Sequence, residues 1–328
     1  MFNTRLRRAL AFAAVAVATL LMWPAAWGQA WPSAKPIRLI VNFPAGGTPD
    51  AVARAIAPHV SSAIGQQIVI DNRSGAGGII GADAAAKAAP DGYTFLLSSG
   101  SAMSIVPLLN AKLPFDPAKD LIPVAAGARL ELFLVARADL PFTNFAEFLR
   151  HAKANPGRLS YGSPGNGTSP HIAGEMMKSQ AGMFAVHIPY RGSGAVLQDL
   201  LGGKLDYTFD PGISFQHVRS GKLRLLAVGS AKRSPLFPDT PTLNELGLTG
   251  FDAGTTHGFW APTGTPPEAV ERMNREINRA LALPAVQEII RNMGAEGTPL
   301  TPRAFGDVIR ADAARYAKII QERKITGE

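Results

Sequence analysis

The sequence predicts an α/β protein of two domains, on the basis of its length, an alternating pattern and the restart of that pattern midway. Of the 328 residues, about 298 follow an export-type N-terminal segment, which is enough for two domains that each bury a core. Short apolar runs alternate with helical periodicity from Ile37 onward, and the alternation restarts after residue 128. Strand–helix–strand repetition of this kind predicts parallel sheets with helices on their faces.

The N-terminal segment has the layout of a cleavable secretory signal. Three arginines within the first eight residues precede an almost unbroken apolar run from Ala9 to Met22, and a small-residue site follows at residues 28–30. A membrane anchor is the alternative, but about 14 apolar residues fall short of the ~20 that span a bilayer. We therefore expect residues 1–30 to be a signal peptide that is removed on export.

The mature chain carries a mild positive charge and no cysteine. The formal net charge of +8 falls to +5 when the three basic residues of the signal are removed. The absence of cysteine excludes disulfides, thiolate metal sites and cysteine nucleophiles. Arginine and aromatic residues do not interleave in a basic patch, so nucleic-acid binding is not expected, whereas small anionic ligands are weakly favoured.

The expected elements follow in regular order along the chain. The first unit comprises strands at 37–43, 67–71 and 93–98 and helices at 52–63 and 81–89, and Gly65 should close the first helix. The second unit comprises strands at 132–135, 159–162, 185–188, 206–209 and 223–228 and helices at 145–154, 172–180 and 195–201. The C-terminal part is mostly helical, with capping-box spacing in Thr265-Pro-Pro-Glu268. Periodicity alone leaves open two sequential domains or a chain that crosses between two lobes and returns.

Two similar loops are the most informative local feature. The first strand runs into Phe43-Pro-Ala-Gly-Gly-Thr-Pro-Asp50, and a strand of the second unit runs into Ser163-Pro-Gly-Asn-Gly-Thr-Ser-Pro-His171. In each, glycines precede a hydroxyl residue, a proline and a helix, so Thr48 and Ser169 are the expected N-caps. Such a helix start presents backbone N–H groups and the positive end of the helix dipole to an anion. Taken singly, each loop could equally be no more than a well-capped helix start.

Other candidate residues lie at further loops. Arg191, in Pro189-Tyr-Arg-Gly192, could pair with a carboxylate or be a surface arginine, and Ser98-Ser-Gly-Ser101 could add hydroxyl groups or be a polar turn. The run Gly75-Ala-Gly-Gly-Ile-Ile-Gly81 has the wrong spacing for a dinucleotide site, so a structural turn is expected there. The sequence contains neither G-x-S-x-G nor H-E-x-x-H, and two potential ligands at His171 and Glu175 are too few for zinc.

A series of motifs extends in order through nearly the whole mature sequence. They include Gly46-Gly-Thr-Pro-Asp50, Asn72-Arg-Ser-Gly-Ala-Gly-Gly78, Ala88-Ala-Pro-Asp-Gly-Tyr93, Gly165-Asn-Gly-Thr168, His171-Ile-Ala-Gly-Glu175, Pro189-Tyr-Arg-Gly192, Asp199-Leu-Leu-Gly-Gly203 and Trp260-Ala-Pro262. This order of motifs resembles that of the tripartite tricarboxylate transporter substrate-binding family, also called the Bug receptors.

The resemblance implies a type II periplasmic-binding-protein-like fold, with two Rossmann-like lobes and a central cleft. Lobe 1 would comprise residues 31–128 and 253–328, and lobe 2 residues 129–252. The ligand would lie between Ala45–Thr48 and Asn166–Ser169, while Asp50 and His171 match motif positions that can serve loop geometry. Family members often carry a Thr-His pair after the third strand, where this chain has Ser99-Gly-Ser-Ala-Met103, so Met103 suggests a less polar wall. The expected ligand-binding residues are Phe43, Ala45, Gly46, Gly47, Thr48, Asp50, Ser99, Ser101, Met103, Asn166, Gly167, Thr168, Ser169, His171, Tyr190, Arg191 and Asp210.

The function expected from this resemblance is that of a periplasmic, non-enzymatic receptor. It would capture a small carboxylate, such as an organic, amino or aromatic acid, and deliver it to a membrane transporter of the tripartite tricarboxylate type. The expected receptor is a monomer without cofactor or metal. The alternatives are a receptor whose partner is a signalling protein, and an exported α/β hydrolase that uses His171.

Overall fold

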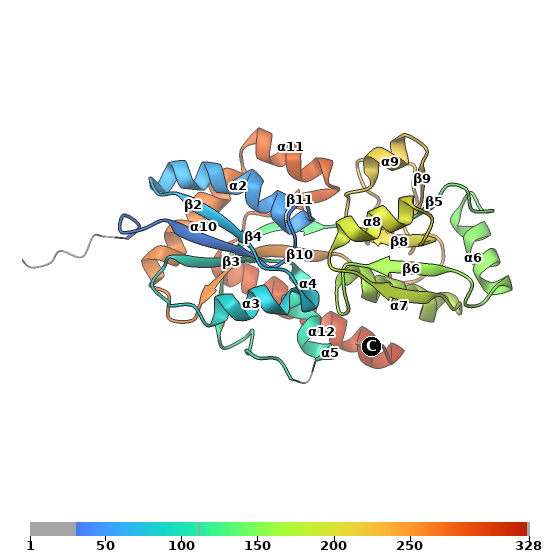
Figure 1. The fold of residues 1–328 in the computed structure, drawn as a ribbon, viewed down its shortest axis with the longest axis horizontal. Helices are drawn as coiled ribbons and strands as arrows, with labels where there is room; N and C mark the ends of the chain where they lie inside the picture. The colour runs from blue at the N-terminus through green and yellow to red at the C-terminus, as the bar shows by residue number, and fades with distance from the viewer. Residues whose placement is uncertain (1–30, 111, 327–328) are drawn as a thin grey trace, which may run out of the picture.

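The computed structural model describes residues 31–110 and 112–326, and within them two α/β lobes lie side by side (Figure 1). Each lobe is built around one sheet. The first sheet has the strand order β11-β4-β10-β3-β1-β2, and the second has the order β7-β6-β8-β5-β9. The type of fold expected from the sequence is confirmed, whereas the predicted signal peptide lies outside the described residues.

The first lobe starts with the predicted alternation. Its elements up to the first crossing are β1 (Ile37–Val41), α2 (Thr48–Ile64), β2 (Ile68–Asn72), the 3-10 turn η1 (Ala76–Gly78), α3 (Ile79–Ala86), β3 (Thr94–Ser98), α4 (Gly100–Ser104), α5 (Val106–Leu109) and β4 (Leu121–Leu130). Strand β1 is almost wholly buried, as expected of a strand covered on both faces. Helix α2 ends as predicted at Gly65, which adopts the left-handed conformation with φ 69°.

The second lobe is continuous in sequence. It comprises β5 (Phe133–Arg137), α6 (Phe145–Ala154), β6 (Ser160–Ser163), α7 (Ser169–Ala181), β7 (Val186–Pro189), α8 (Ser193–Leu201), β8 (Tyr207–Asp210), α9 (Phe215–Arg219) and β9 (Leu223–Val228). Its core contains stacked and edge-on aromatic rings, among them Tyr161, Tyr207 and Phe148. Helix α6 has the bounds that its periodicity predicted, because Asn144 caps it by accepting a hydrogen bond from the Glu147 N–H.

The chain then returns to the first lobe. The returning elements are β10 (Thr255–Pro262), α10 (Pro267–Leu281), α11 (Pro284–Asn292), β11 (Ala295–Gly297) and α12 (Pro302–Arg323). Strand β10 inserts between β3 and β4, so the arrangement is a crossing and a return, the second of the two possibilities that periodicity left open. The boundary expected after residue 128 falls inside β4, two residues before that strand ends.

The expectation of wholly parallel sheets is wrong. Strand β1 pairs in parallel with β2 and β3, but β10 runs antiparallel to both of its neighbours, and β11 runs antiparallel to β4. In the second sheet β6 pairs in parallel with β7 and β8, whereas β5 is antiparallel to β8 and β9. Strands β5 and β10 are each the first strand after a crossing between lobes, and each enters its sheet from the opposite end; β11 then runs in the same direction as β10.

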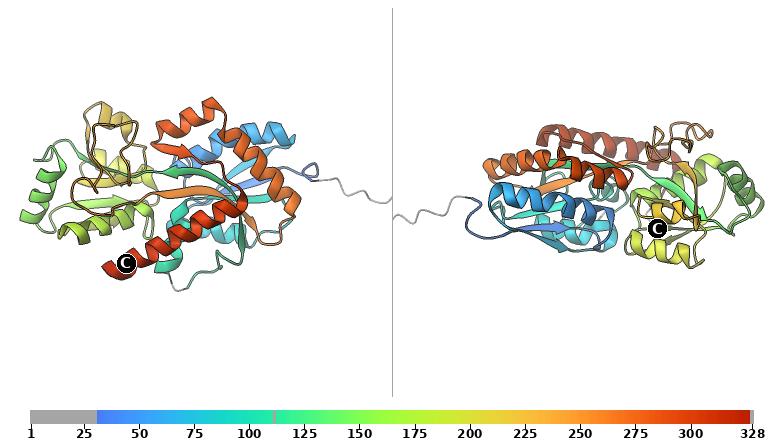
Figure 2. Two further views of the ribbon diagram at one scale, coloured as in Figure 1. Left: turned by 180° about the vertical axis from the view of Figure 1, so that it is seen from behind. Right: turned by 90° about the horizontal axis from the view of Figure 1, so that it is seen from above.

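Helix α12 packs against both lobes. Near its start, Phe305 contacts Trp260 in the first lobe, with ring centroids 4.9 Å apart. Farther along, Tyr316 is fully buried in an apolar cluster made mostly of second-lobe residues, and Ile325 joins the same cluster just beyond the helix. Figure 2 shows from behind how this helix runs from one lobe to the other.

Three expected helix caps are wrong by one residue each. Helix α2 has Gly47 at its N-cap, and helix α7 has Thr168, so Thr48 and Ser169 are the first helical residues and make no capping bond. Helix α10 begins at Pro267 with Pro266 as its N-cap, so the expected capping box is not formed. The Thr265 hydroxyl instead donates to the carbonyl of Pro262, which tightens the turn before the helix.

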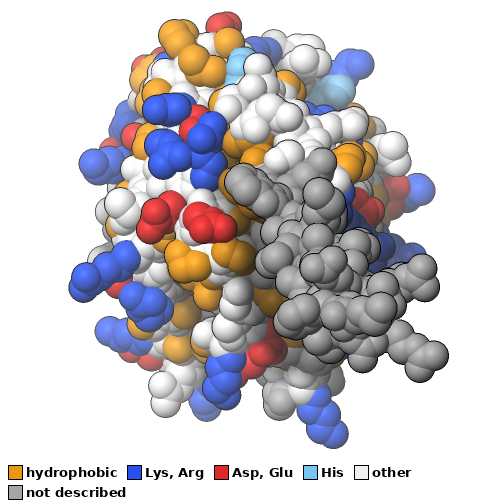
Figure 3. All heavy atoms as spheres, turned by 90° about the vertical axis from the view of Figure 1, so that its left-hand side faces the viewer, with side chains coloured by type: hydrophobic (Ala, Val, Ile, Leu, Met, Phe, Trp, Pro, Cys, Tyr) orange, Lys and Arg blue, Asp and Glu red, His pale blue; other side chains and the backbone are white. Residues whose placement is uncertain are grey.

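The described surface is mixed in charge. On the end of the first lobe shown in Figure 3, Lys and Arg side chains are interspersed with Asp and Glu. Within the described ranges, no helix combines the length and the apolarity that a membrane span requires.

Candidate functional site

A cavity of about 250 Å³ lies between the two lobes. Its walls come from the loop before α2, the start of α4, the crossing segment between β4 and β5, the loop before α7 and the start of α8. The lining residues are Phe43, Pro44, Ala45, Gly47, Thr48, Pro49, Ser99, Ser101, Leu130, Leu132, Pro164, Thr168, Ser169, Pro170, Arg191, Gly192, Ser193, Gly194, Ala195, Gln198, Pro211 and His257. The two glycine loops singled out in the sequence therefore meet across one cavity.

The first loop is held in shape by Asp50. The buried carboxylate of Asp50 accepts hydrogen bonds from the Gly46 N–H, from Arg54 and from Asn72. Burial alone would raise the pKa of Asp50, but these hydrogen bonds outweigh it, so its pKa is lower than usual. The ionised Asp50 thus stabilises the loop from the side away from the cavity. The residues of the loop that line the cavity include Ala45, Gly47 and Thr48.

The second loop is braced by side chains of its own. The Thr168 hydroxyl donates to the carbonyl of Gly165 over 2.6 Å, and the Gly167 N–H donates to Nδ1 of His171 over 3.1 Å. Ser163 adds a further bond, because its hydroxyl accepts from the Gly165 N–H. These contacts fix the backbone at the start of α7, where the first N–H groups of the helix have no partner within the helix.

His171 is a buried structural residue. It is 1 % exposed, and its ring stacks on that of His187 with centroids 4.2 Å apart. Burial lowers the pKa of His171 to about 4 and that of His187 to about 3, so both rings are neutral at physiological pH. His187 is held by a 2.7 Å hydrogen bond between its Nε2 and the Ser163 hydroxyl. The pair supports the second loop from beneath and does not line the cavity.

The electrostatics of the cavity favour an anion. Two helix N-termini, those of the 17-residue α2 and the 13-residue α7, border it. Arg191 is the one charged side chain among the described lining residues, and no carboxylate is found in that set. Arg191 makes no ion pair with any residue of the described ranges, so its guanidinium is available to a ligand.

The structure brings nine of the predicted binding residues to the cavity. They are Phe43, Ala45, Gly47, Thr48, Ser99, Ser101, Thr168, Ser169 and Arg191. Eight others lie elsewhere, namely Gly46, Asp50, Met103, Asn166, Gly167, His171, Tyr190 and Asp210. The expectation of Met103 as a less polar wall is wrong, because its side chain packs in the cluster of Trp260 and Phe305.

Two other predicted binding residues that do not line the cavity, Asp210 and Tyr190, make hydrogen bonds within the second lobe. Asp210 is 3 % exposed and accepts hydrogen bonds from the Gly212 N–H and from both the N–H and the hydroxyl of Ser214. Asp210 therefore fixes the turn that contains Pro211, a residue of the cavity lining. Burial raises the pKa of Asp210, and these hydrogen bonds oppose that effect. The Tyr190 hydroxyl donates to Asp199 over 2.8 Å, and burial together with this carboxylate raises the pKa of Tyr190 to about 12.

Sequence reasoning missed several lining residues. Leu130 and Leu132 flank the crossing between lobes, and Ser193 to Ala195 begin α8, which the sequence placed only as a helix. His257 is a further lining residue that the sequence pattern does not single out. Its place in the cavity depends on where β10 enters the first sheet, and local sequence patterns do not show that pairing.

The two lobes touch across the cleft through glycines. A Cβ atom at Gly77 in the first lobe would lie 2.8 Å from the carbonyl oxygen of Asn166 in the second lobe. A Cβ atom at Gly192 in the second lobe would lie 2.8 Å from Cγ of Pro44 in the first. The lobes therefore approach each other so closely at these two places that an added side chain would clash.

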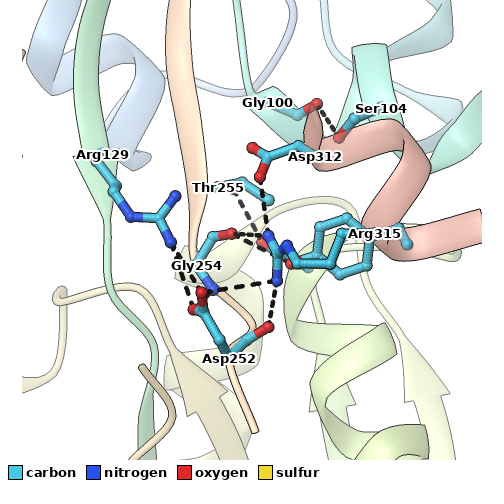
Figure 4. Close-up of polar contacts among 10 residues, drawn as sticks. Gly100, Ser104, Arg129, Asp252, Gly254, Thr255, Asp312 and Arg315 are labelled. Atoms are coloured by element: carbon cyan, nitrogen blue, oxygen red, sulfur yellow. Dashed lines mark hydrogen bonds and ion pairs between the residues drawn. The ribbon is translucent and has the colours of Figure 1, made fainter. Parts of the chain in front are cut away.

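Behind the cavity, an ionic cluster joins the crossing segments to α12 (Figure 4). Arg129 at the end of β4 pairs with Asp252 over 3.1 Å. Arg315 of α12 donates to the carbonyl oxygens of Asp252 and Gly254 and pairs with Asp312 over 2.9 Å. The segment that returns from the second lobe is thus tied to both β4 and α12.

Two α/β lobes, joined by crossing segments and with a cavity between them, define a solute-binding protein. Solved structures support this class. The periplasmic binding protein BugD is 33% identical with a TM-score of 0.85, and the match covers 89% of this chain and 99% of that chain. The chain belongs to the tripartite tricarboxylate transporter receptor family, whose model matches residues 52–325. The resemblance inferred from the sequence motifs is confirmed.

Two relatives of known structure were solved with ligands. The R. palustris protein Rpa4515, solved with adipate, is 34% identical with a TM-score of 0.87, and the match covers 90% of this chain and 99% of that chain. MatC from Rhodopseudomonas palustris, solved with bound malate, is 29% identical with a TM-score of 0.83, and the match covers 88% of this chain and 99% of that chain. Both ligands are dicarboxylates.

Proposed function

We propose that this protein captures a small carboxylate-bearing solute between its lobes in the periplasm and delivers it to a tripartite tricarboxylate-type membrane transporter. One observation carries the proposal: the cavity is bordered by two helix N-termini, one from each lobe, and its described lining includes Arg191 but no carboxylate. The family assignment supports delivery to a transporter. The signal-like segment at residues 1–30 supports export.

The proposed binding mode places a ligand carboxylate between the two loops. Thr48 and Ser169, the first residues of α2 and α7, both line the cavity, as does Thr168 at the N-cap of α7. A carboxylate between them would be held by both lobes at once, so binding would stabilise the closed arrangement. The lobes expected from the sequence, 31–128 with 253–328 and 129–252, are the bodies that we propose to move.

A hydrolytic role for His171 finds no support in the geometry. Its Nδ1 already accepts a hydrogen bond from Gly167, its ring stacks on His187, and it does not reach the cavity. A general base must lie within hydrogen-bond reach of the proton that it removes. We therefore propose a receptor and not an enzyme.

The proposal predicts a thermal shift with carboxylates. The mature protein is screened against mono-, di- and tricarboxylates, amino acids and aromatic acids, with uncharged solutes as controls. A ligand at a hundredfold excess over its dissociation constant adds about 2.7 kcal/mol, which should raise the melting temperature by about 5 °C. A response to uncharged solutes alone would contradict the proposal.

Two variants test the proposed binding loops. Gly47→Leu, at a backbone φ of −78° that accepts a side chain, and Thr168→Ala should each weaken binding of the best carboxylate about tenfold, measured by isothermal titration calorimetry. The control is His59→Ala, on the exposed side of α2. Unchanged affinity in both loop variants would show that the ligand is held elsewhere.

A further inference from the structure

His257 lines the same cavity from β10 and lies outside the motifs that carry the family resemblance. It is 5 % exposed and is the one imidazole among the described lining residues. The hydroxyl groups of Ser99 and Ser101, 3.2 Å apart, line the cavity as well. They precede and begin α4, which lies against β10. The cavity therefore has polar groups away from the two glycine loops.

The hydrogen bonds of His257 fix which ring nitrogen carries the proton. The Gly100 N–H donates to Nδ1 over 3.3 Å, so Nδ1 holds the lone pair and the proton sits on Nε2. Gly100 cannot move away easily, because it packs so closely on β10 that a Cβ atom there would lie 2.5 Å from the carbonyl oxygen of Thr256. Its own carbonyl accepts a 2.9 Å hydrogen bond from the Ser104 hydroxyl (Figure 4).

The imidazole is neutral over the physiological range, since burial lowers its pKa to about 3. Within the described part of the chain, no residue accepts a hydrogen bond from Nε2. A donor that borders a cavity without a protein partner is favourable only when water or a ligand atom accepts its proton. His257 thus presents a neutral, oriented N–H donor to whatever fills the cavity.

We propose that His257 determines specificity by donating from Nε2 to a second hydrogen-bond acceptor on the ligand, apart from the carboxylate held by the loops. The inference rests on the proposed function. It narrows the substrate class to acids with two functional groups, in which the second group is a carboxylate or a carbonyl. A buried donor left unpaired discriminates strongly against an analogue that lacks the acceptor. An acid whose second end is a methyl group is therefore bound more weakly.

The test separates donation from structural support of Gly100. In His257→Asn, the amide oxygen can take the place of Nδ1 and accept from Gly100, but no donor reaches the Nε2 position. In His257→Gln, the amide nitrogen can take the place of Nε2, but the acceptor for Gly100 is lost. Calorimetry compares each with the parent protein for glutarate against pentanoate, and for adipate against hexanoate. For a bound keto acid, the comparison is with the corresponding alkyl acid.

The parent protein should prefer the acid with two groups at least tenfold. The Asn variant should lose that preference to within about threefold, whereas the Gln variant should keep most of it. If the Asn variant kept the preference, the inference would be overturned. It would also be overturned if only the Gln variant lost the preference, because the contact with Gly100 would then be what matters. Equal binding of both acids by the parent protein would also overturn it while leaving the proposed function intact. Failure of the parent protein to bind any carboxylate would overturn the proposed function itself.

Discussion

Lowering the pH from 7.5 to 5 should reduce the free energy of unfolding by about 4 to 6 kcal/mol, through three buried histidines. The pKa of His171 is about 4, and those of His187 and His257 are about 3, all lowered chiefly by burial. The unfolded chain takes up protons on these rings below pH 6.5, whereas the folded protein does not. Stability is therefore complete above pH 6.5 and is lost as the pH falls toward the folded pKa values.

The charged groups around the histidine pair do not reverse this direction. Glu175 favours protonation of His171, but Lys178 opposes it for both rings, and His171 further opposes protonation of His187. At pH 5 the ring is protonated in the unfolded chain but not in the folded protein, so each histidine lowers the free energy of unfolding by about 2 kcal/mol.

Urea unfolding at pH 7.5, 6.5, 5.5 and 5 measures the effect. In His187→Gln, where an amide can keep the contact with Ser163, the loss of stability between pH 7.5 and 5 should fall by about a third. A matched variant at the exposed His59 should leave the loss unchanged. Equal stability of the parent protein at pH 7.5 and 5 would show that the buried rings are protonated in the fold.

Replacing Gly77 by alanine should weaken ligand binding about 10- to 100-fold. The new methyl carbon would lie 2.8 Å from the Asn166 carbonyl oxygen across the cleft, and relief of such overpacking costs about 1 to 3 kcal/mol. Gly77 does not line the cavity, so the variant leaves the ligand contacts of each lobe in place. The clash destabilises only the closed arrangement of the lobes, which is the one in which both loops reach the ligand.

A matched control variant separates the effect of the clash from that of backbone strain. Gly77 has φ +63°, and an alanine there would be strained even without a neighbour. Gly182, at the end of α7, has φ +60° and open space around its Cβ position. Gly182→Ala therefore carries the same strain without the clash. Calorimetry with one carboxylate should show weakened binding in the Gly77 variant alone, and equal affinities in the two variants would contradict the argument from closure.

Local signals in the sequence predict much of the fold. Helix α2 ends at the expected Gly65, α6 has its predicted bounds, and the two glycine loops meet at one cavity, because caps, turns and periodicity act over a few residues. The expected caps at Thr48 and Ser169 are off by one residue. A glycine or threonine one position earlier takes the extended conformation that ends the preceding loop.

Long-range pairing could not be predicted in the same way. Strand β10 is buried along its whole length, so it shows no alternation, and its place between β3 and β4 depends on contacts more than 120 residues away. The position of His257 in the cavity follows from that placement. Met103 was misassigned for a related reason: a short helix, α4, turns it away from the cavity and into the core beside Phe305.

The insertion of β10 into the middle of the first sheet also sets an order of assembly. All the strands of the second sheet come from one uninterrupted stretch, residues 133–228, so that sheet can form before the C-terminal part of the chain is made. The first lobe cannot, since the facing edges of β3 and β4 stay unpaired until residues 255–262 arrive to join them. Until then those two open strand edges are the part of the chain most exposed to pairing with another molecule.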